Sequence, residues 1–310
     1  MAAVEFTEVI KSYGALKALD GLSFAVERGE MFGVIGPDGA GKTTAIRIAC
    51  GLLRADGGSV RILGHDPVRD HHRITHDVGY LSQRFSLYGD LTIDENIAFF
   101  AEIHAVRDYR PARDRLLEMT QLTSFRGRRA DRLSGGMKQK LALACTLVHE
   151  PEVLVLDEPT TGVDPVARRE FWKLLSEFLS RGLTIVMATP YLDEAERCSR
   201  VLLLHEGRRL AIDEPASLQA SLAGRLYEVI ANTARPPLEA LRQVPGVADA
   251  QGFGDRAHVT FEDVPEGDVS KQIEGALARH RIGVTSVRSI GATLEDVFIA
   301  MLRDARTTTS

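Results

Sequence analysis

The sequence predicts an α/β protein with a largely parallel sheet, followed by a small α+β unit. Over the first ~215 residues, short apolar runs of strand length alternate with helical patterns, which is typical of a parallel sheet covered by helices. The remaining residues change to a β-α-β-β-α-β-α order, with a boundary near Asp213–Gly224 after a turn-like Asp-Glu-Pro. We therefore expect two domains, residues 1–215 and 216–310.

Apolar runs and their spacing define the elements of the first domain. The expected strands are Val4–Val9, Leu22–Val26, Phe32–Ile35, Gly79–Ser82, Val153–Leu156, Thr184–Ala188 and Arg200–His205. The expected helices are Thr43–Leu53 and Met137–Val148, together with a helical pattern between Asp94 and Leu133. The stretch that holds His71, His72 and His76 is expected to be a solvated loop.

The second domain has its own regular order. We expect, in sequence, a strand Leu226–Ala231, a helix Pro237–Gln243, a hairpin of Val247–Gln251 and Ala257–Phe261, a helix Asp268–His280, a strand Gly283–Ser289 and a helix Leu294–Leu302. That order fits a split β-α-β (ferredoxin-like) domain. Such a domain is more often a packing or dimerisation module than a catalytic site.

Composition excludes several classes of protein. Hydrophobic residues make up 44% of the chain and charged residues 26%, as in an average soluble protein. The net charge of −5 argues against nucleic-acid binding. No apolar run reaches the ~18 residues of a membrane helix, and Met1–Ser12 lacks a signal peptide, so we expect a cytoplasmic protein. Cys50, Cys145 and Cys198 are widely spaced, so neither a disulfide framework nor a zinc site is expected.

A glycine-rich loop follows the strand that ends at Ile35. The sequence Gly36-Pro37-Asp38-Gly39-Ala40-Gly41-Lys42-Thr43-Thr44 matches the pattern G-x-x-x-x-G-K-[ST]. Its glycines let the backbone approach phosphates closely, and the helix that follows directs its positive end at them. Lys42 can reach the β- and γ-phosphates, and the Thr43 hydroxyl can bind Mg²⁺. The predicted nucleotide-binding residues here are Gly36, Asp38, Gly39, Ala40, Gly41, Lys42, Thr43 and Thr44.

Two acidic residues follow the apolar strand Val153–Leu156. Because ligands collect at the carboxyl ends of parallel strands, we expect Asp157 and Glu158 to lie beside the glycine-rich loop. Side chains alternate along a strand, so the two acids can take different roles. We expect Asp157 to hold Mg²⁺, through water, and Glu158 to orient or deprotonate the attacking water.

A third motif lies between the loop and the acid pair. Leu133-Ser134-Gly135-Gly136-Met137-Lys138-Gln139 opens a helix with a hydroxyl and exposed amides, which form a second anion site. It resembles the L-S-G-G-x-x-Q signature of ABC-type ATPases, and the three motifs stand in that family's order within residues 4–215. The resemblance implies a P-loop fold of ABC type, with a mixed sheet core and a helical subdomain of residues 85–150.

The same resemblance implies an assembly and further site residues. Two copies of the chain would form a head-to-tail dimer that encloses ATP and Mg²⁺, with Ser134, Gly135 and Gly136 of one copy facing the phosphate loop of the other. Tyr13 would stack on adenine, or else be a core tyrosine at a strand end. Gln83 would sense both Mg²⁺ and an integral membrane permease, and Asp164 would cross the dimer interface. Phe85–Ile97 would receive a coupling helix of the permease, or else be a loop and a capped helix.

One position departs from the family pattern. Pro190 stands where the family has a histidine that contacts the γ-phosphate, and proline offers neither a side-chain donor nor a backbone N–H. Hydrolysis is therefore expected to be slow, to depend wholly on Glu158, or to need a partner subunit. Thr189 and Tyr191 are candidate replacement donors.

Two short sequences resemble ABC exporters of the drug- and antibiotic-efflux type. Thr293–Phe298 reads T-L-E-D-V-F, and Tyr191–Glu196 reads Y-L-D-E-A-E. The implied protein hydrolyses MgATP on the cytoplasmic face of the membrane, drives export of drugs or other hydrophobic cargo through a separate permease, and ends in an accessory domain. Three alternatives stay open: a helix that Thr293 merely caps, a nucleotide switch without turnover, and a non-transport ABC ATPase of DNA repair, chromosome structure or translation.

Overall fold

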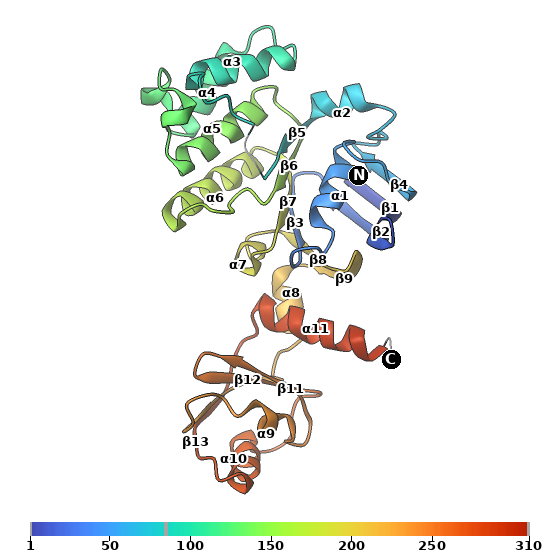
Figure 1. The fold of residues 1–310 in the computed structure, drawn as a ribbon, viewed down its shortest axis with the longest axis vertical. Coiled ribbons are helices and arrows are strands. Elements are labelled where there is room, and N and C mark those ends of the chain that lie inside the picture. The colour runs from blue at the N-terminus through green and yellow to red at the C-terminus, as the bar shows by residue number, and fades with distance from the viewer. Residues whose placement is uncertain (1, 84–85, 309–310) are drawn as a thin grey trace. The chain divides into compact units, whose positions relative to one another are not determined.

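A computed structural model describes residues 2–83 and 86–308 of the chain. The chain divides into two compact units, Met1–Ile212 and Asp213–Ser310. Each unit has its own hydrophobic core. Figure 1 shows the helices and strands of both units.

The first unit alternates strands with helices through most of its length. Its strands are β1 (Ala2–Tyr13), β2 (Leu16–Glu27), β3 (Met31–Ile35), β4 (Gly57–Ile62), β5 (Val78–Leu81), β6 (Val153–Asp157), β7 (Thr184–Thr189), β8 (Arg200–His205) and β9 (Arg208–Asp213). Its helices are α1 (Lys42–Ala49), α2 (His71–Asp77), α3 (Ile93–Ile103), α4 (Arg110–Met119), α5 (Gly135–Leu147), α6 (Pro165–Ser180) and α7 (Leu192–Ala195), with 3-10 turns at Thr123–Phe125 and Ala130–Arg132.

A six-stranded sheet of order β5-β6-β7-β3-β8-β9 forms the centre of this unit. The pairs β5–β6, β6–β7, β7–β3 and β3–β8 are parallel, which confirms the predicted α/β architecture. Every residue of β3, β6 and β7 is buried, so these strands are apolar along their length instead of alternating. Their polar residues, Asp157, Thr184 and Thr189, stand at the strand ends. The register pairs Ile35 with Thr189 and Asp157 with Ala188. The loop after β3 and the acids at the end of β6 therefore flank the end of β7.

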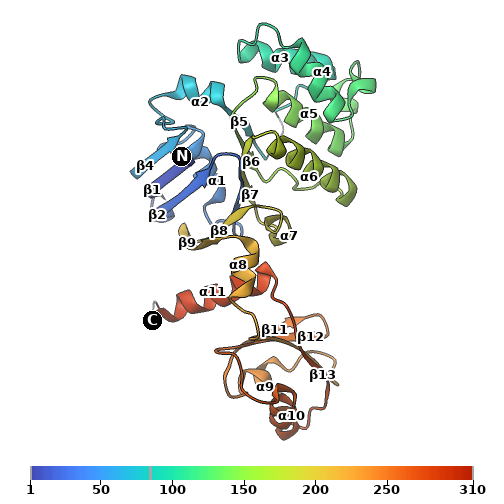
Figure 2. The same cartoon turned by 180° about the vertical axis from the view of Figure 1, so that it is seen from behind.

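A second sheet, antiparallel and of order β2-β1-β4, packs against the first. Three rings stack between the sheets: Phe6 lies 4.4 Å from Phe24, and Phe24 lies 5.5 Å from Phe32, centroid to centroid. Ile46 and Ile48 of α1 join the same core. Figures 1 and 2 show this sheet and α1 on one side of the parallel strands, with helices α3–α6 on the other.

Several predicted boundaries are wrong for local reasons. Helix α1 ends at Ala49, not Leu53, because the amides of Leu52 and Leu53 both donate to the Arg47 carbonyl and close the helix. The histidine stretch is helix α2, not a loop: Ile74 anchors it in the core while the histidines stay exposed.

Helix α3 begins with a reciprocal cap. The Thr92 hydroxyl accepts the Glu95 amide, and the Glu95 carboxylate accepts the Thr92 amide. The predicted segment Phe85–Ile97 thus contains a capped helix start, while Phe85 itself lies outside the described residues.

The second unit is a four-stranded antiparallel sheet with helices on it. Its elements are α8 (Pro215–Ala220), β10 (Leu226–Ala231), α9 (Leu238–Arg242), β11 (Val247–Phe253), β12 (Arg256–Phe261), α10 (Val269–Arg279), β13 (Val284–Ser289) and α11 (Leu294–Thr308). The sheet order β11-β12-β10-β13 is that of a split β-α-β domain. Apolar residues of α9 and α10 cover one face of this sheet. Within residues 2–83 and 86–308, no helix has the length and apolar character needed to span a membrane.

Candidate functional site

The glycine-rich loop joins β3 to α1 and is held in a tight path. Gly41 caps α1 with φ near +107°, where a Cβ atom would stand 2.4 Å from the Ala18 carbonyl oxygen. Gly36 lies so close to the neighbouring strand that a Cβ atom would stand 2.2 Å from the Leu204 carbonyl oxygen. Only glycine fits these two positions. The loop therefore brings backbone amides to the N-terminus of α1.

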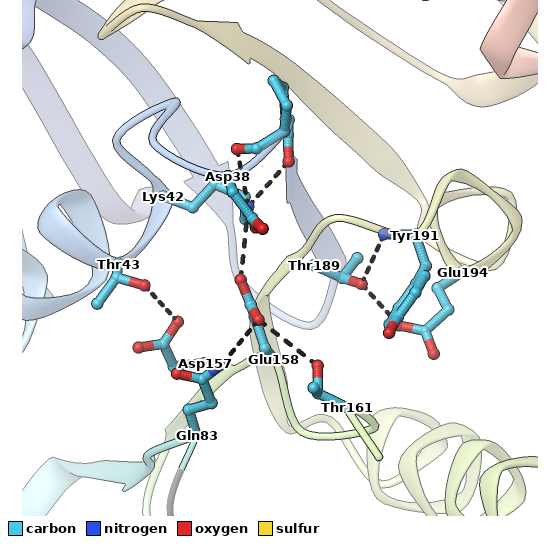
Figure 3. Close-up of polar contacts among 12 residues, drawn as sticks. Asp38, Lys42, Thr43, Gln83, Asp157, Glu158, Thr161, Thr189, Tyr191 and Glu194 are labelled. Carbon is cyan, nitrogen blue, oxygen red and sulfur yellow. Dashed lines mark hydrogen bonds and ion pairs between the residues drawn. The ribbon is translucent and has the colours of Figure 1, made fainter. Parts of the chain in front are cut away.

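Lys42 lies at the centre of the site and is only 4% exposed. Its ammonium group donates to the carbonyl oxygens of Gly36 at 2.8 Å and Pro37 at 3.1 Å. It also lies 3.4 Å from the Glu158 carboxylate and 4.0 Å from Asp38 (Figure 3). A buried cation with a carboxylate partner at this distance is a natural binding group for phosphate oxygens.

The two acids at the end of β6, Asp157 and Glu158, diverge, as the alternation of side chains along a strand predicts. Asp157 accepts the Thr43 hydroxyl at 3.0 Å. Glu158 turns the other way, adopts φ near +49°, and accepts the Gln83 side-chain amide at 3.0 Å. A non-glycine residue in the left-handed region is strained. The Glu158 amide, which donates to the Ala188 carbonyl at 2.9 Å, fixes the strained turn. Figure 3 shows the Glu158 carboxylate between Lys42 and Gln83.

Burial raises the pKa of Asp157, although the hydrogen bond from Thr43 and the charges of Arg47 and Lys42 oppose the shift. Burial and the nearby Asp157 charge also raise the pKa of Tyr80 to about 12. The negative charge of Asp157 is therefore incompletely compensated by protein groups. A hydroxyl and an under-compensated carboxylate 3.0 Å apart form an oxygen donor set that suits Mg²⁺.

A cavity of about 530 Å³ opens over Lys42, Thr43 and Glu158. The residues that line it are Tyr13, Leu16, Ala18, Asp38, Gly39, Gly41, Lys42, Thr43, Thr44, Gln83, Glu158, Thr161, Pro190 and Tyr191. Tyr13 is half exposed there, with the Lys11 ammonium 5.7 Å from its ring centroid, so it is not a core tyrosine. The structure thus brings together residues of the glycine-rich loop, Glu158 of the acid pair, and the separately predicted Tyr13 and Gln83.

The signature residues and Asp164 do not line this cavity. Ser134 caps α5, and its hydroxyl accepts the Met137 amide at 3.3 Å. Asp164 caps α6, and its carboxylate accepts the amides of Val166 and Ala167 at 3.0 Å each. Within one copy of the chain, both residues therefore act as helix caps.

One predicted replacement for the missing histidine is wrong. Thr189 is fully buried, and its hydroxyl donates to the Glu194 carboxylate at 2.8 Å instead of facing the cavity. The same hydroxyl accepts the Tyr191 amide at 3.1 Å. Tyr191 does line the cavity, with the Arg168 guanidinium 5.1 Å from its ring centroid.

Three residues near the site are missing from the sequence predictions: Thr160, Arg168 and Glu194. Glu194 belongs to the Y-L-D-E-A-E match, but its position in the sequence gives no sign that it is buried. Gln139, the last residue of the signature motif, is also fully buried and donates to the Pro159 carbonyl at 2.7 Å. The signature helix is therefore tied directly to the turn after Glu158.

Comparisons with known proteins identify the family of the chain. Residues 19–161 match the family model for ABC transporters. The probable multidrug ABC transporter ATP-binding protein YbhF of Escherichia coli K12 is 40% identical over 293 residues, which are 93% of this chain and 50% of that protein. The chain thus spans about half the length of that relative.

Two other relatives match along nearly their whole length. The Nod factor export ATP-binding protein I of Burkholderia thailandensis is 37% identical over 305 residues, 97% of each chain. The daunorubicin resistance ATP-binding protein DrrA3 of Streptomyces coeruleorubidus is 34% identical over 299 residues, 96% of this chain and 94% of that protein.

Solved structures share the fold of the first unit. The cbiO1 subunit of an ABC transporter complex from Clostridium perfringens superposes with a TM-score of 0.66 at 28% identity, covering 71% of this chain and 91% of that one. A dimeric ATP-binding cassette bound to ADP and phosphate superposes with a TM-score of 0.62 at 26% identity, covering 68% of this chain and 98% of that one. This chain therefore belongs to the family of ABC transporter ATP-binding proteins.

Proposed function

We propose that this chain binds MgATP in the cavity beside Lys42, hydrolyses it, and passes the energy to a separate membrane permease. The observation that carries the proposal is the convergence of Lys42, Thr43, Gln83 and Glu158 on one cavity. Asp157 stands directly behind Thr43, whose hydroxyl it accepts at 3.0 Å. A buried cation, an oxygen pair for Mg²⁺ and a carboxylate held by an amide are the parts that phosphoryl transfer requires.

Each side chain has a chemical task in this proposal. Lys42 would leave the loop carbonyls and Glu158 to bind the β- and γ-phosphate oxygens of ATP. Thr43 and Asp157, with Gln83 beside them, would hold Mg²⁺, which neutralises phosphate charge when bound.

Glu158 would then accept a proton from a water molecule. The water oxygen bonds to the γ-phosphorus while the bond from that phosphorus to the bridging oxygen of ADP breaks, giving ADP and inorganic phosphate. Gln83 holds Glu158 in place through the 3.0 Å hydrogen bond from its amide. Tyr13 would cover the adenine ring at the open side of the cavity.

We further propose that two identical copies form a head-to-tail dimer. Ser134, Gly135, Gly136 and Asp164 do not line the cavity of their own chain, so they are available to complete the site of a second copy. The solved dimeric cassette bound to ADP and phosphate supports this assembly. The names of the relatives, which mention multidrug transport, Nod factor export and daunorubicin resistance, support an exporter of drugs or other hydrophobic molecules.

In this proposal the chain works at the cytoplasmic face of the membrane through its permease, and the second unit serves as an accessory domain.

Pro190 favours one alternative, a regulatory switch that binds ATP without hydrolysing it. The proline lines the cavity where the family has a histidine, so the site has one phosphate donor fewer.

Binding of a fluorescent ATP analogue with Mg²⁺ tests the first step. Lys42→Ala is expected to weaken binding by about a hundredfold, because a charge-assisted contact to phosphate is lost in a buried site. Lys173→Ala, which removes an exposed lysine of α6, is the matched control and keeps the wild-type affinity. Equal affinities of the two variants would contradict the proposed site.

A further inference from the structure

A buried carboxylate lies behind the candidate site and takes no part in the chemistry described above. Glu194 of α7 is 1% exposed, and two threonine hydroxyls donate to it. Thr160 reaches one carboxylate oxygen at 2.5 Å and Thr189 reaches the other at 2.8 Å. Both threonines are fully buried. Figure 3 shows Glu194 and Thr189 beside the cavity residues.

The two threonines belong to two segments that each carry residues lining the cavity. Thr160 stands two residues after Glu158, in the turn that also holds Thr161. Thr189 ends β7 and directly precedes Pro190 and Tyr191, which line the cavity. Glu194 therefore joins the turn that carries the proposed water-activating carboxylate to the segment that carries the proline.

The Arg168 guanidinium lies near the Glu194 carboxylate. The Arg168 Nε atom lies 3.8 Å from the carboxylate oxygen that also accepts Thr160, and the same guanidinium stacks over Tyr191. A buried carboxylate is stable only when hydrogen bonds and a counter-charge compensate it. Arg168 supplies that charge and also connects Glu194 to the Tyr191 side of the cavity.

The turn after Glu158 is held from a second direction as well. The Gln139 amide donates to the Pro159 carbonyl at 2.7 Å. Residues 159 and 160 are thus each fixed by a buried side chain from a different helix, α5 and α7. Glu158 itself has a strained backbone, with φ near +49°, and such a conformation persists only where its surroundings hold it.

We propose that Glu194 is a positioning residue for hydrolysis: through Thr160 and Thr189 it holds the Glu158 turn against the Pro190–Tyr191 segment. Because proline stands in place of the family's histidine, that segment contributes no side-chain donor at residue 190. The rate of hydrolysis therefore depends more strongly on how exactly Glu158 is positioned. This inference rests on the proposed ATPase function and adds a residue that does not contact the nucleotide.

Steady-state phosphate release from MgATP tests the proposal with near-isosteric variants. Thr160→Val removes one hydroxyl and is expected to lower kcat about tenfold while KM stays within about twofold of the wild-type value. Displacing a catalytic group slows the chemical step but leaves substrate binding in the ground state unchanged. Glu194→Ala is expected to lower kcat further. Glu194→Gln is expected to recover part of the loss, because its amide oxygen still accepts one threonine hydroxyl.

Thr120→Val is the matched control. Thr120 is also fully buried, but its hydroxyl donates to the Leu116 carbonyl of α4, away from the cavity. This variant is expected to keep the wild-type kcat even where its unfolding midpoint falls. A kcat of Thr160→Val and Glu194→Gln equal to that of Thr120→Val would overturn the positioning role while leaving the ATPase function intact. Absence of turnover in the wild type would instead overturn the ATPase function, and the positioning role with it.

Discussion

Acidification should destabilise the first unit through one buried histidine. His149 is 7% exposed, and its ring stacks on His104 with centroids 3.8 Å apart. Among the described residues, neither ring nitrogen of His149 has a hydrogen-bond partner. Burial, followed by the charge of His104, lowers the pKa of His149 to about 4, although the nearby Val78 backbone and the Asp77 charge act in the opposite direction.

The sign and size of the effect follow from linkage. In the unfolded chain His149 has its ordinary pKa near 6.5, so between about pH 6.5 and pH 4 the unfolded state binds more protons than the folded state. Stability is therefore lost as the pH falls through this range and is fully present above it. Each pH unit within the range is worth about 1.4 kcal/mol, so a change from pH 8 to pH 5 lowers the free energy of unfolding by about 2 kcal/mol.

Urea unfolding followed by the fluorescence of Trp172 measures this loss, because the chain has one tryptophan and it lies on α6 of the same unit. With a slope of roughly 2–3 kcal/mol per molar urea, the midpoint should fall by about 0.7–1 M between pH 8 and pH 5. His149→Phe keeps a stacking ring but cannot titrate, and should lose most of this difference. His72→Phe, at an exposed position of α2, is the control and should keep it. An equal pH dependence in the wild type and His149→Phe would refute the reasoning.

Two further predictions concern the loop and the signature. Gly41→Ala places a side chain at a positive φ and brings its Cβ atom to 2.4 Å from the Ala18 carbonyl oxygen. It should therefore lower the free energy of unfolding by about 3 kcal/mol in urea titrations. Gly39 also has a positive φ, but a Cβ atom there would meet no neighbour, so Gly39→Ala should lower the free energy of unfolding by only about 1–2 kcal/mol. Equal losses in the two variants would contradict the clash expected at Gly41. Ser134→Ala should leave ATP binding by the isolated chain unchanged and slow phosphate release about tenfold, if the hydroxyl acts on a second copy; unchanged turnover would argue against that role.

Much of the fold follows from local patterns, and the misses have physical causes. The apolar runs of β3, β6 and β7 are visible in the sequence because strands buried on both faces must be apolar. Strand β4 is not among the predicted elements, because it begins with two glycines and only two of its six residues are buried. Its pairing with β1, more than forty residues earlier, defines it instead.

Some residues of the candidate site can be identified from the sequence, and others only from the structure. Lys42, Thr43, Asp157 and Glu158 stand in short motifs, so residue type and spacing are enough to identify them. The Thr160–Glu194 contact joins residues 34 positions apart, and nothing in either segment marks it. Thr189 looks available in the sequence, but the structure commits its hydroxyl to Glu194, which explains why that prediction fails.

The central claim is that Glu158 drives ATP hydrolysis without the family's histidine. Phosphate release at saturating MgATP, compared between the wild type and Glu158→Gln, tests it most directly. Glu152→Gln is the matched control, because Glu152 stands at the other end of β6 and is exposed. We expect turnover in the wild type and in Glu152→Gln, and a loss of at least about a hundredfold in Glu158→Gln with ATP binding retained. ATP binding without turnover in the wild type, or equal turnover in Glu158→Gln, would contradict the account.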